Sequence, residues 1–171
     1  FGACDGLCCS NTRHLYDIGW NGIYIEPNEE WYQKLIKNTD SNKALCINSF
    51  VNYEGENTLD NIIDQTRFKN NNFDIISIDI DSFDFEVLKS INKYLPKLII
   101  IEINSCHSPK NSDYVDFEIA NNNIGQPMII MIEEAKKKDY FPLCFTGNIF
   151  LVKNEYKKYF EPFLRTIEDM Y

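Results

Sequence analysis

The feature that most constrains the fold is a regular alternation of short apolar runs with stretches of helical periodicity. Four runs are predicted as β-strands, at residues 22–26, 44–48, 73–79 and 98–103. The last two are apolar on both faces, which is typical of strands buried inside a parallel sheet. Strands that alternate with helices predict an α/β fold with right-handed crossovers.

The segments between these runs carry apolar side chains at the spacing of one helix face. Helices are predicted over residues 31–37, 59–68 and 85–95. Asn28 and Thr58 come just before two of them and are predicted to act as N-caps.

The pattern changes after residue 104, where a polar, proline-containing segment extends to Pro127. A helix is predicted over residues 128–138, followed by strands at 140–145 and 148–152. Because only Thr146 and Gly147 separate these two strands, they are predicted to form an antiparallel hairpin at the sheet edge.

Composition limits the classes of function. The chain has 171 residues, 44% of them hydrophobic, which predicts one domain spanning residues 1–171. Its 17 basic and 26 acidic side chains give a net charge of -9, which argues against a nucleic-acid partner. No apolar run is long enough to span a membrane. Six cysteines without a CxxC pair predict reduced thiols in a cytoplasmic protein, and the adjacent pair at 8 and 9 disfavours a metal site with Cys4.

The first 26 residues combine a glycine-containing turn, a helical stretch and a strand that ends on a carboxylate. Gly2 and Gly6 allow the backbone to turn sharply and to approach a ligand closely. Glu26 follows the glycines by about 20 residues, the position from which a carboxylate accepts hydrogen bonds from ribose hydroxyls. This layout predicts a nucleoside-binding βαβ unit, although a plain turn explains the glycines alone equally well.

The charge of the turn narrows the choice of nucleoside. The glycine spacing is G-x-x-x-G, unlike the dinucleotide fingerprint, and Asp5 places a negative charge where a dinucleotide carries its pyrophosphate. A phosphate-free, positively charged nucleoside fits better, and S-adenosylmethionine is the predicted cofactor. A nicotinamide-dependent oxidoreductase is disfavoured for the same reason.

Several motifs in series resemble those of the FkbM-like methyltransferases, and they extend over nearly the whole chain. They are Phe-Gly-Ala-Cys-Asp-Gly at 1–6, Ser10-Asn11-Thr12 with Leu15, Gly19-Trp20 with Gly22, Ile25-Glu26, Ser-Ile-Asp-Ile-Asp at 77–81, Ile-Glu-Ile-Asn at 101–104, and Gly125 before a helix. The resemblance implies O-methylation dependent on S-adenosylmethionine, often of a sugar hydroxyl, with a small-molecule or glycan acceptor. It also implies a Rossmann-like class I methyltransferase sheet, mostly parallel, with the antiparallel hairpin at its C-terminal end.

Two features depart from the family pattern. Ser82 stands where many relatives have glycine, and the first strand, expected before Phe1, is not in the sequence. We therefore expect an N-terminally incomplete domain. The alternative function is a catalytically silent binding domain with the same fold. The sequence is compatible with a homo-oligomer and with a monomer.

Ligands of an open α/β sheet lie beyond the carboxyl ends of its strands, so the polar residues at those ends are the site candidates. Glu26 is predicted to bind the ribose, Asn48 and Ser49 the adenine edge, and Asp5 the positive charge of the cofactor. The full predicted cofactor set is Gly2, Ala3, Asp5, Gly6, Asn11, Thr12, Glu26, Asn48, Ser49 and Asp79.

The predicted catalytic residues are Asp79, Asp81 and His107. Converging carboxylates repel each other unless a proton or a cation intervenes. One alternative is a Mg or Mn ion held by Asp79, Asp81, Glu102 and Asn104, which would lower the pKa of an acceptor hydroxyl. The other is a single carboxylate or His107 acting as general base. The long segment 105–127 is predicted to form a lid over the acceptor.

Overall fold

The computed structural model describes residues 1–81, 83–115 and 125–170. Its strands are β1 (Gly22–Ile25), β2 (Ala44–Ile47), β3 (Ile75–Ile78), β4 (Leu98–Glu102), β5 (Tyr140–Phe145) and β6 (Asn148–Lys153). Its helices are α1 (Arg13–Asp17), α2 (Glu29–Lys37), α3 (Leu59–Asp64), α4 (Asp84–Ser90), α5 (Met128–Lys137) and α6 (Ile167–Met170), with 3-10 turns η1 (Asn154–Tyr159) and η2 (Glu161–Phe163).

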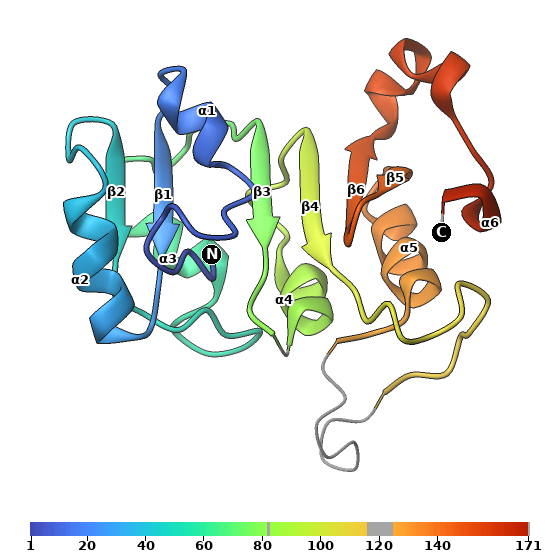
Figure 1. Cartoon of the computed structure of the whole chain (residues 1–171), viewed down its shortest axis with the longest axis horizontal. Coiled ribbons are helices and arrows are strands. Elements are labelled where there is room, and N and C mark those ends of the chain that lie inside the picture. The colour runs from blue at the N-terminus through green and yellow to red at the C-terminus, as the bar shows by residue number, and fades with distance from the viewer. Residues whose placement is uncertain (82, 116–124, 171) are drawn as a thin grey trace.

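The strands form two hydrogen-bonded groups that lie side by side (Figure 1). β1 pairs with β2 in parallel, and β3 pairs with β4 in parallel. β6 runs antiparallel between β4 and β5, so the second group has the order β3-β4-β6-β5. The fold is therefore a mixed α/β arrangement, and the predicted C-terminal hairpin is confirmed.

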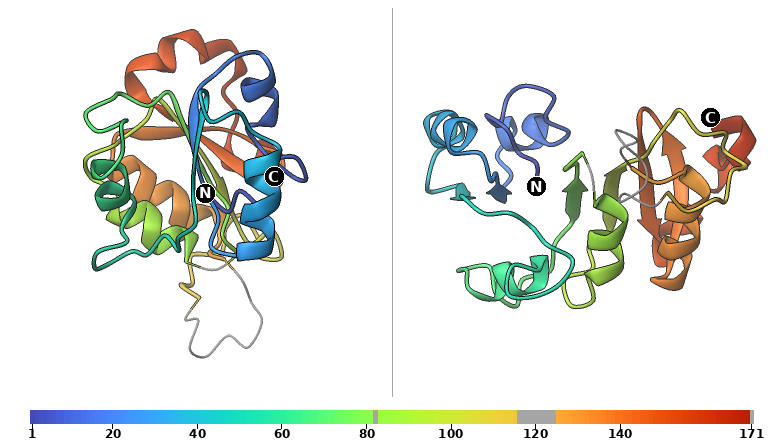
Figure 2. Two further views of the ribbon diagram at one scale, coloured as in Figure 1. Left: turned by 90° about the vertical axis from the view of Figure 1, so that its left-hand side faces the viewer. Right: turned by 90° about the horizontal axis from the view of Figure 1, so that it is seen from below.

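Helices cover both faces of the strands. Figure 2 shows α1 and α2 on one face and α3, α4 and α5 on the other. Apolar side chains of β3 and β4, among them Ile78, Ile99 and Ile101, are completely buried against the helices. Ile100 is buried as well, so β4 is buried on both faces, whereas β3 buries one face and leaves Ile75 and Ser77 half-buried on the other.

The starts of α2 and α3 follow the sequence closely because each is fixed by a local hydrogen bond. The Asn28 side chain accepts the N–H of Trp31, and the Thr58 side chain accepts the N–H of Asn61, so both predicted N-caps are confirmed. Thr12 precedes α1 without a side-chain cap.

Two helices end earlier than their periodicity predicts. α3 stops at Asp64, where the Thr66 hydroxyl donates to the Ile63 carbonyl and accepts the N–H of Phe68. α4 stops at Ser90 because the Asp60 carboxylate accepts the backbone N–H groups of residues 92, 93 and 94. Hydrogen bonds to side chains thus compete with helix propagation at the C-terminal ends of α3 and α4.

The inner edges of β1 and β3 face each other, and no ladder joins them within the described ranges. The first residues of the chain bridge this interval instead. The Phe1 nitrogen donates to the Ser77 carbonyl at 2.8 Å, and the Ala3 N–H donates to the Ile25 carbonyl at 3.2 Å. Among the residues that the structure describes, no helix is long and apolar enough to cross a membrane.

Candidate functional site

The opening turn is fastened to the end of β1 by Glu26. This side chain is 5% exposed, and its two carboxylate oxygens accept different backbone N–H groups. Oε2 accepts from Cys4 at 2.8 Å, and Oε1 accepts from Asn28 at 2.9 Å. Glu26 therefore faces the glycine-containing turn and not bulk solvent, the position from which the sequence predicts ribose binding.

Gly2 and Gly6 are required by the close packing of this turn. Both have positive φ, +70° and +73°. A Cβ on Gly2 would lie 1.5 Å from the carbonyl oxygen of Asp79, and one on Gly6 would lie 2.7 Å from Leu35. The turn thus passes directly over the end of β3, which brings it close to Asp79 as well as to Glu26.

Asp5 shapes the same turn. One carboxylate oxygen accepts the N–H groups of Leu7 and Cys8 at 2.9 and 2.8 Å. These backbone hydrogen bonds lower the pKa of Asp5, so the side chain is ionised at neutral pH. A negative charge is therefore present on the turn, next to Cys4 and Gly6, as the cofactor prediction requires.

Asn11 connects the opening loop to two strands. Its amide nitrogen lies 3.1 Å from the Ser77 hydroxyl and 3.4 Å from an Asp79 carboxylate oxygen. Its oxygen accepts from the side chain of Asn148 at 3.2 Å. Asn11 is thus a structural link between the loop, β3 and β6, beside the predicted catalytic acids.

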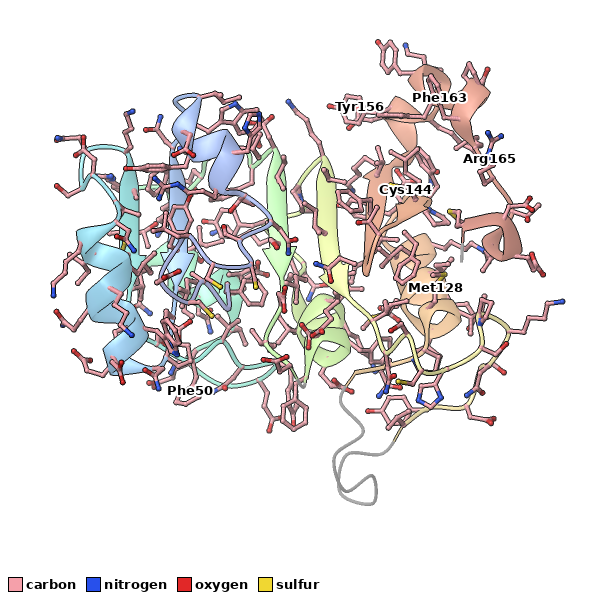
Figure 3. The ribbon with its side chains drawn as sticks, in the orientation of Figure 1. Phe50, Met128, Cys144, Tyr156, Phe163 and Arg165 are labelled. Carbon is pink, nitrogen blue, oxygen red and sulfur yellow. The ribbon has the colours of Figure 1, made fainter. Side chains whose placement is uncertain are left out.

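The two residues predicted at the adenine edge lie just beyond β2. The Asn48 amide donates to the carbonyls of Glu26 and Pro27, at 3.1 and 3.3 Å, which ties the ends of β1 and β2 together. The Ser49 hydroxyl donates to the carbonyl of Phe50 at 2.9 Å. Phe50 is exposed at this same edge of the molecule (Figure 3).

Three carboxylates converge at the ends of β3 and β4. Oxygens of Asp79, Asp81 and Glu102 all lie within 4.8 Å of one another. Asp81 has φ +59°, a left-handed backbone conformation that is uncommon for a residue with a side chain. The residue with this unusual backbone is therefore one of the three that form the carboxylate cluster. The structure thus brings together three of the four residues predicted as metal ligands.

This convergence changes the protonation of the cluster. Burial raises the pKa of Glu102 to about 7, and the charges of Asp79 and Asp84 add to the shift. Burial and the charge of Asp81 also raise the pKa of Asp79. Near neutral pH, Glu102 therefore exchanges a proton readily, which is the property of a general acid or base.

Asn104 and His107 lie in the chain beyond β4. The Asn104 side-chain oxygen accepts the N–H of Cys106 at 3.0 Å. Nδ1 of His107 lies 3.2 Å from the Asn111 amide, and the His107 N–H donates to the Asn104 carbonyl. Of the predicted lid at 105–127, residues 116–124 lie outside the described residues, as does Ser82.

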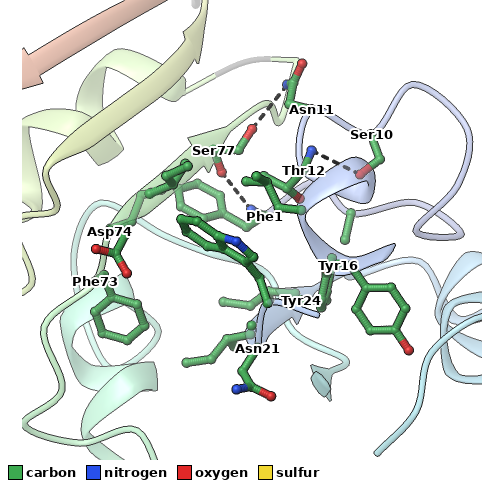
Figure 4. Close-up of a pocket in the computed structure, with 18 of the residues that line it drawn as sticks. Phe1, Ser10, Asn11, Thr12, Tyr16, Asn21, Tyr24, Phe73, Asp74 and Ser77 are labelled. Atoms are coloured by element: carbon green, nitrogen blue, oxygen red, sulfur yellow. Dashed lines mark hydrogen bonds between the residues drawn. The ribbon is translucent and has the colours of Figure 1, made fainter. Parts of the chain in front are cut away.

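A cavity of about 430 Å³ lies between the inner edges of β1 and β3 (Figure 4). Gly2, Ala3, Asn11 and Thr12 contribute to its wall, whereas Glu26 does not. The rest of the wall comes from β1, β3, α1 and α3 and mixes apolar side chains with polar ones such as Asn21, Asp74 and Asp79. The cavity therefore reaches the carboxylate cluster through Asp79, which lines it, and does not reach Glu26.

Three further residues of the site were missed by the sequence reasoning. Ser77 and Asn148 hold Asn11, and Asp84 is buried while its carboxylate accepts the N–H of Ile80. Ser77 interrupts an otherwise apolar strand, which is a usable signal. Asn148 gives no such signal, because its position depends on its pairing with Glu102 across β4 and β6.

Comparison with known families matches residues 53–121 to the methyltransferase FkbM domain. The matched segment contains the carboxylate cluster and His107, and it does not include the opening turn or Glu26. No curated protein and no solved structure matches the chain. The family match supports an FkbM-like methyltransferase family, as the sequence motifs indicate, and methyl transfer as the class of activity.

Proposed function

We propose, starting from the FkbM-domain match, that the chain is an O-methyltransferase that uses S-adenosylmethionine and acts on a hydroxyl of a sugar or related natural product. The observation that carries the proposal is the position of Glu26 against the opening turn, because a buried carboxylate there meets the requirement for a ribose ligand. We also propose that the strands belong to one mostly parallel sheet of the Rossmann-like class I methyltransferase type.

The residues of the turn fit a positively charged nucleoside. Glu26 would accept hydrogen bonds from the ribose, since each of its oxygens has lone pairs beyond the one used by a backbone N–H. Asp5 would attract the positive end of the cofactor, and Gly2 would let the backbone approach it. When bound, S-adenosylmethionine supplies an electrophilic methyl group on a sulfonium.

The carboxylate cluster would prepare the acceptor. An unactivated sugar hydroxyl is a poor nucleophile at neutral pH, so the chain must supply a base that accepts its proton. Glu102, with a pKa of about 7, would take that proton, and Asp79 and Asp81 would orient the hydroxyl. His107 remains the predicted alternative base. A Mg or Mn ion would be held by the oxygens of Asp79, Asp81 and Glu102, with Asn104 as the fourth predicted ligand.

The cavity between β1 and β3 has a different role in this proposal: it is the position of a β-strand that leads into Phe1. The two facing strand edges that border it support this assignment, since a sheet edge has unused backbone donors and acceptors. Hydrogen exchange on the protein from its natural source tests it. Slow exchange along both inner edges supports a strand, and fast exchange contradicts one.

Calorimetric titration with S-adenosylmethionine tests the function directly. The protein and a Glu161→Gln variant, which loses an exposed carboxylate far along the chain, should bind equally, and Glu26→Ala should lose affinity. Equal binding by Glu26→Ala would reject the ribose assignment. Methyl transfer to a panel of glycan acceptors then separates an enzyme from a silent binding domain, which would bind the cofactor without turnover.

A further inference from the structure

Two adjacent cysteines lie on the opening turn with their thiols in contact. The Sγ atoms of Cys8 and Cys9 are 3.6 Å apart, and both side chains are exposed. Cys9 has φ +53°, in the left-handed region that side chains rarely adopt. The backbone of the turn is thus held in an unusual conformation that places neighbouring thiols on the same side.

We propose that Cys8 and Cys9 form a reversible modification site, a disulfide between adjacent residues made by exchange with a small-molecule disulfide such as oxidised glutathione. The sulfurs need only move from 3.6 Å to about 2.05 Å to bond. Consecutive Cα atoms are about 3.8 Å apart, which is closer than in most disulfides, so the bond is strained and easily reduced.

The exchange proceeds in two balanced steps. One thiolate attacks a sulfur of the glutathione disulfide, forming a mixed disulfide and releasing one glutathione. The neighbouring thiolate then attacks the protein sulfur of that mixed disulfide and releases the second glutathione. The two protein thiols lose two electrons and two protons, and the glutathione disulfide gains them.

The other cysteines are less suited to this reaction. Cys4 is only partly exposed, and it has no adjacent cysteine in the sequence. Cys106 is exposed, but it has no adjacent cysteine in the sequence. Contact with the Cys9 thiol raises the pKa of Cys8, so the exchange should accelerate as the pH rises above neutral.

The site is connected to the candidate cofactor site through Asp5 and Cys4. Asp5 holds the N–H groups of Leu7 and Cys8, and the N–H of Cys4 binds Glu26 on the other side of Asp5. Closing the ring at Cys8 and Cys9 rearranges this short segment. Resting on the proposed function, the inference is that oxidation weakens cofactor binding by between about 5-fold and about 150-fold.

The test begins with chemistry that does not depend on methyl transfer. The protein is incubated with oxidised glutathione, its remaining thiols are alkylated, and the products are identified by mass spectrometry. The wild type and Cys106→Ser should carry a disulfide between Cys8 and Cys9. Neither of these two cysteines should then be alkylated. Cys8→Ser and Cys9→Ser should instead carry glutathione on the remaining thiol. Two glutathiones on the wild-type pair, or two free thiols there, would overturn the proposal.

Titration of reduced and oxidised protein with S-adenosylhomocysteine tests the coupling. Weaker binding after oxidation, restored by a reductant and equally present in Cys106→Ser, supports it. A disulfide that leaves the affinity unchanged overturns the coupling alone. If neither form binds the nucleoside while the disulfide still forms, the proposed function fails and the modification site stands.

Discussion

The carboxylate of Glu26 accepts the backbone N–H of Cys4 at 2.8 Å, across 22 residues of chain. This contact, with the second one to Asn28, gives Glu26 a structural role in addition to its proposed one. The position of the turn therefore depends on the residue that is proposed to bind the ribose.

Glu26→Ala should therefore destabilise the protein as well as weaken cofactor binding. It leaves the N–H groups of Cys4 and Asn28 without their acceptor, at a cost of about 1–3 kcal/mol in the free energy of unfolding. Glu26→Gln keeps the shape and one acceptor oxygen, so it should be less destabilised. Urea denaturation of both variants measures this, and equal stability of Glu26→Ala and wild type would contradict the contact.

Gly2→Ala should disrupt the turn over β3. Its Cβ would lie 1.5 Å from the Asp79 carbonyl oxygen, so the backbone has to move, and we expect a loss of more than about 2 kcal/mol in the free energy of unfolding. Gly55→Ala is a matched control, since Gly55 also has positive φ but no atom within 4 Å of the added Cβ. That variant should lose only about 1 kcal/mol. Thermal denaturation compares the two, and similar losses would contradict the packing.

The strands, and the polar residues that follow them, were predictable from sequence. The contacts between side chains of different strands and helices were not. Short apolar runs located β1 to β4, and burial on both faces makes the pattern plainest at β4. The early end of α4 was not predictable, because the Asp60 carboxylate that stops it comes from a different helix. The convergence of Asp79 with Glu102 follows from parallel pairing, but the raised pKa values follow from burial, which requires the structure.

Glu102 should make the protein less stable as the pH rises from about 4.5 to about 7. The unfolded side chain loses its proton near the ordinary value of 4.5, whereas the folded one keeps it up to a pKa of about 7. The folded state therefore binds more protons in this window, and its stability falls as the pH rises. Allowing for partial exposure, we expect a change of about 1 kcal/mol.

Glu102→Gln should remove most of that dependence, because the amide does not titrate. Denaturation midpoints at pH 5 and pH 7.5 measure the effect, with Glu161→Gln as the exposed control. A variant whose pH dependence equals that of wild type would show that Glu102 has an ordinary pKa. The methyl-transfer rate of Glu102→Gln should also fall if this carboxylate takes the acceptor proton.

Added Mg distinguishes a cation from a shared proton in the carboxylate cluster. If Asp79, Asp81 and Glu102 hold the ion, Mg should raise the thermal midpoint of the protein by mass action. The effect should strengthen from pH 6 to pH 8, because binding displaces the proton that Glu102 keeps up to about pH 7. Asp81→Asn should abolish it, whereas Asp113→Asn, which changes an exposed aspartate after β4, should leave it intact. A midpoint that does not respond to Mg at either pH assigns the cluster to proton transfer alone.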